Sequence, residues 1–276
     1  MKARARSAAR HLALDALSLA DSAKPGTDQD LARPRVHNLY LHEVPRQEEE
    51  RFRSLLRWLV DTGHTLIPYG EGIDRCAHDR VDRSYVTFSF DDGYASNVRA
   101  AQILEEFHTT GCFFVVTDFI GHTDLSSARA FLGTGITEPA MSWSDLHQLR
   151  AAGHEIGNHT RSHKNLAAMP EDQASEEIDQ GRLRLETEFG DVPHFAWPLG
   201  RWHHFTESAR QTASSTHKSV ASAERGSHGP SIRASGDWCP RRDHIMTSWP
   251  LRHSKIFVRR SARLSTAPDQ WPSLAP

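Results

Sequence analysis

Strand-like and helix-like segments alternate along ~200 residues of this 276-residue chain. The strand-like segments include 36–44, 85–90, 112–116 and 195–198, and stretches with helical spacing of apolar residues lie between them. This order is typical of a parallel sheet covered by helices, either a (β/α) barrel or a doubly wound sheet. In both architectures the functional residues lie at the carboxyl ends of the strands.

An adjacent acid pair, Asp91 and Asp92, follows the strand-like run 85–90. Two neighbouring carboxylates repel each other, so their position at a strand end suggests a bound cation, although a solvated Asp-Gly turn has the same letters. Downstream, the spacing of His159 and His163 predicts two imidazoles on one face of a helical turn. One carboxylate and two histidines would hold a divalent metal and leave positions open for water and substrate. The pattern therefore favours a hydrolytic metal site.

The histidine spacing is a weak signal by itself. With 18 histidines in the chain, a random arrangement would contain about one pair at this spacing. Its context adds weight, because the pair follows the apolar Ile156 and the turn residue Gly157, which would deliver both rings to the end of another strand.

Composition excludes several classes of partner. The chain has 33 basic and 35 acidic residues, so we expect neither nucleic acid nor an anionic membrane as partner. The cysteines, Cys76, Cys112 and Cys239, are odd in number and widely spaced. They form no zinc-binding pairs and no disulfide framework, which suits a reducing compartment; one disulfide with one free thiol is the alternative.

The two ends of the chain differ from its middle. Four basic residues precede the apolar stretch 12–20, but Asp15 and Ser18 interrupt it, so it resembles an amphipathic helix more than a signal peptide. No apolar run approaches the ~18 residues needed to cross a bilayer. We expect a cytoplasmic protein without stable membrane insertion, with weak membrane-surface contact of the first residues as the alternative. The predicted organisation is an amphipathic segment and linker (1–35), a catalytic domain (36–260) and a loose tail (261–276).

Three segments in sequence order, 87–94, 153–163 and 195–200, resemble the motifs of the polysaccharide deacetylase family, carbohydrate esterase family 4. The segment 39–44 is similar to the opening strand of its bacterial exopolysaccharide branch. The resemblance covers roughly residues 36 to 260, and three linked motifs are more specific than any one of them. Membership implies a distorted, incomplete (β/α) barrel with the site in a groove at the strand ends.

The resemblance also implies roles for individual residues. Asp92, His159 and His163 match the family's metal ligands, and Asp91 matches its catalytic base. The metal would be Zn²⁺, with Co²⁺, Ni²⁺ or Fe²⁺ as alternatives, and would polarise the amide carbonyl. Backbone N–H groups near Leu199 would stabilise the oxyanion. The implied reaction removes N-acetyl groups from an N-acetylated sugar or polysaccharide and releases acetate, which makes carbohydrate the expected partner and leaves the oligomeric state open.

The family pattern also bears on what orients the base and what protonates the leaving amine. Ala196 stands where many members have an arginine that orients the base, and we expect Arg241 or, preferentially, Arg242 to supply the missing cation. The leaving amine needs a proton, and His253 lies in a segment that matches the family's motif for this role. The next candidate for the acid is His244.

Three other functions fit parts of the pattern. A non-catalytic relative could keep the fold and bind glycan, a metal-dependent hydrolase could cleave another amide, and two histidines with a carboxylate also suit an Fe²⁺ redox enzyme. The intact Asp91 argues against the binding protein, because a base beside a metal contributes to chemistry and adds little to carbohydrate affinity.

Overall fold

A computed structural model describes residues 13–18, 31, 33–230 and 238–263 of the chain. Its centre is an eight-stranded parallel sheet with the order β7-β6-β5-β4-β3-β1-β8, and β2 pairs with β3 beside this path. The strands are β1 (Arg35–Leu41), β2 (Thr65–Leu66), β3 (Ser84–Asp92), β4 (Gly111–Val115), β5 (Glu155–Asn158), β6 (His194–Ala196), β7 (Ser219–Ala221) and β8 (Asp243–His244).

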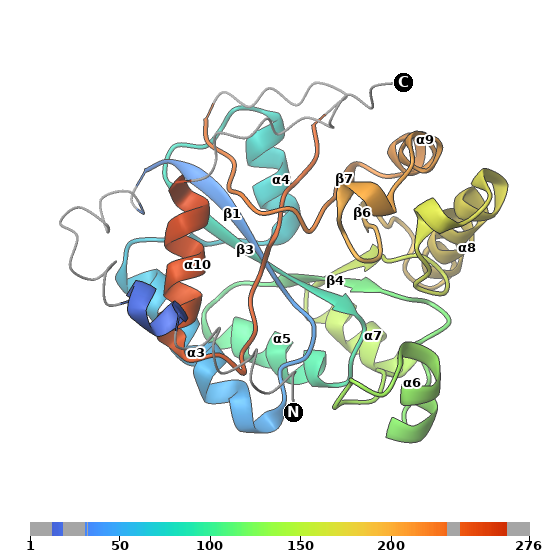
Figure 1. Cartoon of the computed structure of the whole chain (residues 1–276), viewed down its shortest axis with the longest axis horizontal. Coiled ribbons are helices and arrows are strands. Elements are labelled where there is room, and N and C mark those ends of the chain that lie inside the picture. The colour runs from blue at the N-terminus through green and yellow to red at the C-terminus, as the bar shows by residue number, and fades with distance from the viewer. Residues whose placement is uncertain (1–12, 19–30, 32, 231–237, 264–276) are drawn as a thin grey trace.

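Helices lie around the outside of this sheet (Figure 1). They are α3 (Glu49–Asp61), α4 (Tyr69–Ala77), α5 (Ser96–Glu106), α6 (Leu125–Leu132), α7 (Trp143–Ala151), α8 (Glu171–Phe189), α9 (Glu207–Thr216) and α10 (Leu251–Arg263). In Figure 1, α3, α5 and α7 follow the lower side of the sheet, α8 and α9 lie at the right, and α10 stands at the left. The alternation of strands and helices predicted from the sequence is therefore confirmed.

The barrel is incomplete between β7 and β8, the two strands at the ends of the strand order. In the described part of the chain, β7 and β8 end the strand order and do not pair with each other. Two backbone hydrogen bonds cross the gap instead: Ser222 N–H donates to Pro240 O at 2.9 Å, and Arg242 N–H donates to Glu224 O at 3.1 Å. The curled sheet is thus the distorted, incomplete (β/α) barrel expected from the sequence, rather than a doubly wound sheet.

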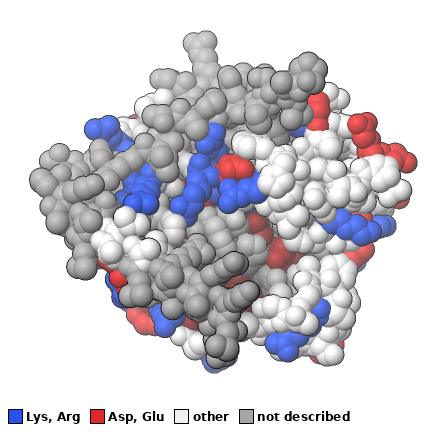
Figure 2. Space-filling view, viewed as in Figure 1, with Lys and Arg blue, Asp and Glu red and all other residues white. Residues whose placement is uncertain are grey.

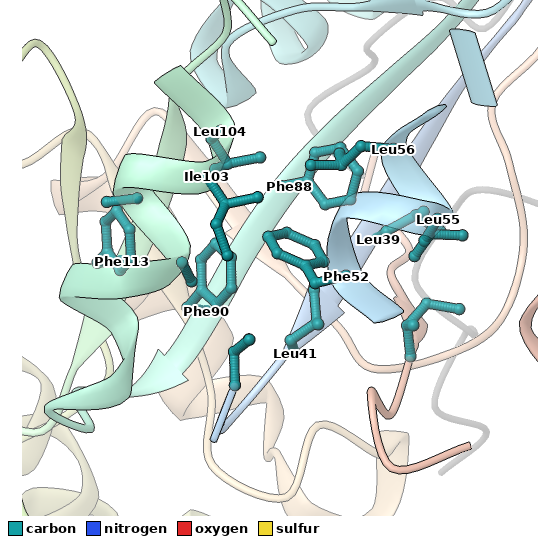
Figure 3. Close-up of a cluster of buried hydrophobic side chains, with 14 of the residues drawn as sticks. Leu39, Leu41, Phe52, Leu55, Leu56, Phe88, Phe90, Ile103, Leu104 and Phe113 are labelled. Atoms are coloured by element: carbon teal, nitrogen blue, oxygen red, sulfur yellow. The ribbon is translucent and has the colours of Figure 1, made fainter. Parts of the chain in front are cut away.

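Strand β3 separates the hydrophobic core from the barrel interior. Phe88 and Phe90 point toward the helices, where they pack with residues of α3 and α5 (Figure 3). Phe52 of α3 lies edge-on to both rings, at centroid distances of 5.7 and 6.1 Å. Successive side chains of a strand alternate between its faces, so Ser89 and Asp91 face the interior. The helix packing therefore determines which acid of the pair enters the barrel.

Some residues outside the predicted catalytic domain belong to the fold. Leu14, in the helical segment 13–18, and Leu31 are buried in the main core cluster. Helix α10 extends to Arg263, past the predicted domain boundary at residue 260. The rest of the predicted N-terminal segment and tail falls largely outside the described residues.

The cysteines, the helix lengths and the surface charges can be compared with what composition suggested. All three cysteines are buried free thiols, as expected, so the alternative with one disulfide is wrong. Within the described ranges, every helix is too short or too polar to span a bilayer. On the face shown in Figure 2, the described basic side chains gather near the middle with acidic groups among and around them.

Glu155 lies at the amino-terminal end of β5, the end of the barrel opposite the acid pair. Both of its carboxylate oxygens accept a hydrogen bond from Gly70 N–H, at 3.0 and 2.9 Å, and His194 Nε2 is 3.8 Å from Oε2. Burial raises the pKa of Glu155 to about 7. The same cause, burial, lowers the pKa of His194 to about 4, so this histidine is neutral and does not offset the acid's charge.

Glu155→Gln is expected to flatten the pH dependence of stability. The folded-state pKa lies above the unfolded value of 4.5, so the stabilisation by Glu155 is complete below pH 4.5 and is lost as the pH rises through about 7. This pKa shift corresponds to a change of about 3 kcal/mol in the free energy of unfolding. Chemical denaturation at a series of pH values should show the wild type losing roughly this amount relative to Glu155→Gln between these limits. Parallel curves for the two proteins would contradict the assignment.

Candidate active site

The acid pair lies at the carboxyl end of β3, where Asp91 is opposite Phe114 and Asp92 opposite Val115 of β4. Asp91 is 3% exposed and Asp92 is 4% exposed. Asp92 has a φ of 76°, a left-handed conformation that aspartate tolerates better than most residues. This conformation breaks the strand's alternation, which would otherwise aim Asp92 away from the interior. Two adjacent acids can therefore serve one site.

His159 and His163 lie in a loop after β5, not on a helical turn as the sequence spacing suggested. Thr160 and His163 have positive φ values of 69° and 59°, and these bends fold the loop back on itself. The two rings nevertheless meet, with centroids 5.2 Å apart. The juxtaposition was predicted correctly, but the backbone that produces it was not.

Asp92, His159 and His163 form the one group of possible metal ligands found within the described residues, with ligand atoms all within 4.8 Å of one another. Asp92 Oδ1 lies 3.5 Å from His159 Nε2 and 3.2 Å from His163 Nε2. This oxygen is buried and accepts no hydrogen bond from the described residues. Such a group is costly to bury unless a cation binds it.

The second nitrogen of His159 determines how its ring is presented. Its Nδ1 donates a hydrogen bond to Ala196 O at 2.7 Å, which leaves Nε2 as the lone-pair atom facing Asp92. Burial lowers the pKa of His159 to about 4, so the ring is neutral at physiological pH. A neutral imidazole, oriented by a backbone carbonyl and beside a carboxylate, is suited to bind a divalent metal. The donor set thus fits a metal such as Zn²⁺.

Arg242 reaches Asp91 from the gap between β7 and β8. Its Nη1 and Nη2 donate to the two carboxylate oxygens of Asp91 at 2.7 and 3.0 Å, the fork geometry that arginine alone provides. Nη1 also donates to Ser89 Oγ at 3.2 Å, and Nε donates to Ser222 O at 3.1 Å. The predicted base-orienting residue is therefore in contact with the predicted base, although β6 carries Ala196 where an arginine was expected.

The environment of this pair keeps Asp91 ionised. Burial acts to raise the pKa of Asp91, but the charge of Arg242 and its hydrogen bonds lower it to about 2. The guanidinium is completely buried and packs against the rings of Tyr40 and Phe114, at 4.7 and 4.9 Å from their centroids. Arg241, the other candidate, instead donates from Nη1 to Arg225 O.

A pocket of about 160 Å³ opens beside these groups. It is lined by Tyr40, His42, Asp91, His159, His163, Trp197, Leu199, Gly200, Ala223 and Arg242. Leu199 is 51% exposed and has a φ of 65°, an unusual backbone conformation for a leucine. Gly200 follows in the same conformation, and a Cβ there would lie 2.2 Å from Ala223 Cβ. The loop at Leu199 is therefore held close to the segment after β7.

Sequence reasoning did not assign a role to His42, which lies just after β1 and lines this pocket. Its Nδ1 lies 3.1 Å from His244 Nε2, and its backbone carbonyl accepts a hydrogen bond from Asn97 Nδ2. Burial, followed by the neighbouring His42, lowers the pKa of His244 to about 3. A neutral His244 can accept the Nδ1 proton of His42 and leave the other ring nitrogen for the pocket. The resemblance of segment 39–44 to a family motif was the signal that pointed to this strand.

The structure does not bring His253 to this group. It lies on α10, is fully buried, and its Nε2 is 2.6 Å from Asp15 Oδ1 in the helical segment 13–18. It is not among the residues that line the pocket in the described structure. The residues around His253 matched a family motif, but the helix that carries it packs on the outside of the barrel.

The fold resembles those of several solved bacterial proteins. IcaB from Ammonifex degensii matches with a TM-score of 0.66 and 19% identity, covering 82% of this chain and 97% of that one. The deacetylase PplD from Streptococcus pyogenes, solved with acetate, matches with a TM-score of 0.62 and 16% identity over 82% and 98% of the two chains. A de-N-acetylase from Aggregatibacter actinomycetemcomitans gives a TM-score of 0.63 and 17% identity over 81% and 99%.

Sequence comparison places the chain in a family. No curated protein sequence matches it significantly. The model of the polysaccharide deacetylase family, however, matches residues 78–218, a span that begins before β3 and ends before β7 and includes the acid pair and both loop histidines. This span is slightly more than half of the chain. The chain therefore belongs to the polysaccharide deacetylase family.

Proposed function

We propose that this protein is a metal-dependent hydrolase that removes N-acetyl groups from an N-acetylated polysaccharide and releases acetate. The observation that carries the proposal is the buried, bidentate pairing of Arg242 with Asp91 directly beside Asp92 and the two loop histidines. A protein that only bound glycan would have no need of a permanently ionised carboxylate held in place at the edge of a metal site.

The metal site would consist of Asp92, His159 and His163. A divalent ion bound there supplies Lewis acidity, which polarises the amide carbonyl and lowers the pKa of water. The hydrogen bond from His159 to Ala196 O and the burial of Asp92 keep these ligands oriented before any ion binds. Zn²⁺ suits this donor set best, and Co²⁺, Ni²⁺ and Fe²⁺ suit it as well.

Asp91 would act as the general base. Its low pKa keeps it ionised at neutral pH, and Arg242 holds both oxygens so that the carboxylate cannot rotate away from the pocket. It would take the proton of the attacking water while the carbonyl carbon becomes tetrahedral. The backbone N–H of Leu199, which donates to no other backbone group of the described residues, would stabilise the oxyanion.

His42 would act as the general acid, in the role that sequence reasoning gave to His253. It lines the pocket, and a neutral His244 behind it would hold the ring in one orientation. Protonation of the leaving nitrogen breaks the C–N bond, so that acetate and a free amine on the sugar are released.

His42→Gln is expected to lower kcat for acetate release by about 10²-fold or more, because proton transfer to the leaving group is lost. His253→Gln should instead affect thermal stability, since it disturbs the contact between α10 and Asp15. The rate of acetate release and the metal content are measured for each of the two variants. A large loss of kcat in His253→Gln with normal rates in His42→Gln would reverse the two assignments.

Acetate release from a panel of N-acetylglucosamine oligomers tests the proposed function. The purified protein should release acetate from at least one oligomer, lose this activity with a chelator, and regain it when Zn²⁺ is added. Matched O-acetylated sugars and simple acetamides determine whether the activity is specific for N-acetyl groups on a glycan. Metal-loaded protein that releases no acetate from any of them would favour a glycan-binding protein instead.

A further inference from the structure

A second, larger cavity lies beside the catalytic pocket and shares His42 as a wall. Its volume is about 430 Å³, compared with about 160 Å³ for the pocket. It is formed by the residues that follow β1 and β8, by Tyr94 after β3, and by the loop 135–137. Except for the loop 135–137, which follows α6, these residues lie at or just after the carboxyl ends of strands, where (β/α) barrels bind their ligands. We call this space the side cavity.

The walls of the side cavity are held in place by two acidic residues. Glu43 Oε1 accepts hydrogen bonds from the backbone N–H groups of Thr137 and Glu138, both at 2.7 Å, which fixes the loop against the end of β1. Glu48 Oε2 accepts a hydrogen bond from Thr247 Oγ1 at 2.5 Å. Both carboxylates therefore have defined positions in the wall before any ligand binds.

The charge of the side cavity differs from that of the catalytic pocket. Apart from histidines, Glu43 and Glu48 are the charged residues that line it, and no lysine or arginine of the described chain does so. The nearby Arg51 donates instead to the backbone carbonyls of Thr247 and Ser248. In the catalytic pocket, by contrast, Arg242 balances Asp91, and a bound divalent ion would add positive charge.

We propose that the side cavity binds a glucosamine unit, with its protonated amine, while the neighbouring N-acetylated unit of the same chain occupies the catalytic pocket. This inference rests on the proposed function, because such a chain contains both the substrate and the product of the reaction. The acidic walls attract an amine that the metal-loaded pocket would repel. The preferred substrate class is therefore a partly deacetylated amino-sugar polymer. A sugar unit that has already lost its acetyl group would bind in the side cavity and place the next acetylated unit in the catalytic pocket.

Binding of two trisaccharides tests the proposal. A glucosamine trimer, which contains no acetyl group, is titrated into the Zn²⁺-loaded wild type, and an N-acetylglucosamine trimer into Zn²⁺-loaded Asp91→Asn to prevent turnover. Glu48→Gln should weaken binding of the glucosamine trimer about five- to tenfold and change binding of the acetylated trimer much less. Glu50→Gln is the matched control, because Glu50 is exposed on α3 and pairs with Arg57. This control should bind both trimers as the wild type does.

High salt provides a second readout, since screening should reduce the effect of Glu48→Gln. Equal binding of the glucosamine trimer by wild type and Glu48→Gln overturns the proposal. An equal loss for both trimers also overturns it, because the side cavity would then contribute to sugar binding without recognising the amine. Acetate release is measured separately. If Glu48→Gln weakens binding of the glucosamine trimer as expected but the wild type releases no acetate from any glycan, the proposed function alone is refuted.

Discussion

Asp91→Asn is expected to lower kcat for acetate release by about 10³-fold while the protein still binds its metal. The asparagine keeps the size of the side chain and can still receive a hydrogen bond from Arg242, but it cannot accept a proton from water. Asp92 and the two loop histidines remain to hold the ion. Acetate release is measured together with the zinc content of each preparation.

Asp92→Asn is the matched control for the neighbouring acid. It removes the carboxylate charge from the predicted metal site and should lower zinc affinity as well as activity. The two variants together therefore separate the base from the ligand. If Asp91→Asn lost zinc and Asp92→Asn retained it, the two acids would have exchanged roles; if both were fully active, neither role would stand.

Arg242→Ala is expected to reduce kcat/KM about 10²-fold and to move the acidic limb of the pH–rate profile to higher pH. Without the guanidinium, burial dominates and the pKa of Asp91 rises from about 2, so a larger fraction of the base is protonated near neutrality. The same change leaves a buried carboxylate without its partner, which typically destabilises a fold by about 3–5 kcal/mol. The profile is measured below the melting temperature of the variant.

Arg242→Lys keeps a positive charge but cannot donate the two parallel hydrogen bonds. Its activity should lie between those of wild type and Arg242→Ala, and it remains informative if the alanine variant does not fold. Arg241→Ala is the neighbouring control, because Arg241 donates to a backbone carbonyl and not to Asp91. A shifted pH–rate profile in Arg241→Ala and an unchanged one in Arg242→Ala would refute the assignment.

The acid pair and the histidine pair could be predicted because each is a local pattern at the end of one strand. Strand β3 is rich in aromatic and β-branched residues, β5 is a short strand around Ile156, and both are parallel neighbours of β4 in the sheet. Parallel strands place their carboxyl ends at the same edge, so residues that follow them come together. The loop conformation after β5 could not be predicted, because the positive φ values of Thr160 and His163 depend on how that loop packs.

The prediction of the general acid shows that a short sequence motif does not determine where a residue lies in the fold. His253 fitted a short motif, but α10 packs against the segment 13–18 and places this histidine next to Asp15. His42 carried no chemical signal of its own, because a single histidine after a strand has many possible roles. Its position in the pocket and its contact with His244 follow from the pairing of β1 with β8, strands that are far apart in the sequence.

By itself, the sequence determined the strand-and-helix alternation, the family motifs and the positions of the acid and histidine pairs at strand ends, because hydrophobic periodicity and residue type are local properties of the chain. The family resemblance offered Arg241 and Arg242 as the cation beside Asp91, and only the tertiary structure decided between them. Arg242 is 151 residues away, and it reaches the base because the barrel nearly closes between β7 and β8, where Arg242 N–H bonds to Glu224 O. A buried carboxylate needs a cation at its side, but the local sequence does not decide which of two adjacent arginines points to it.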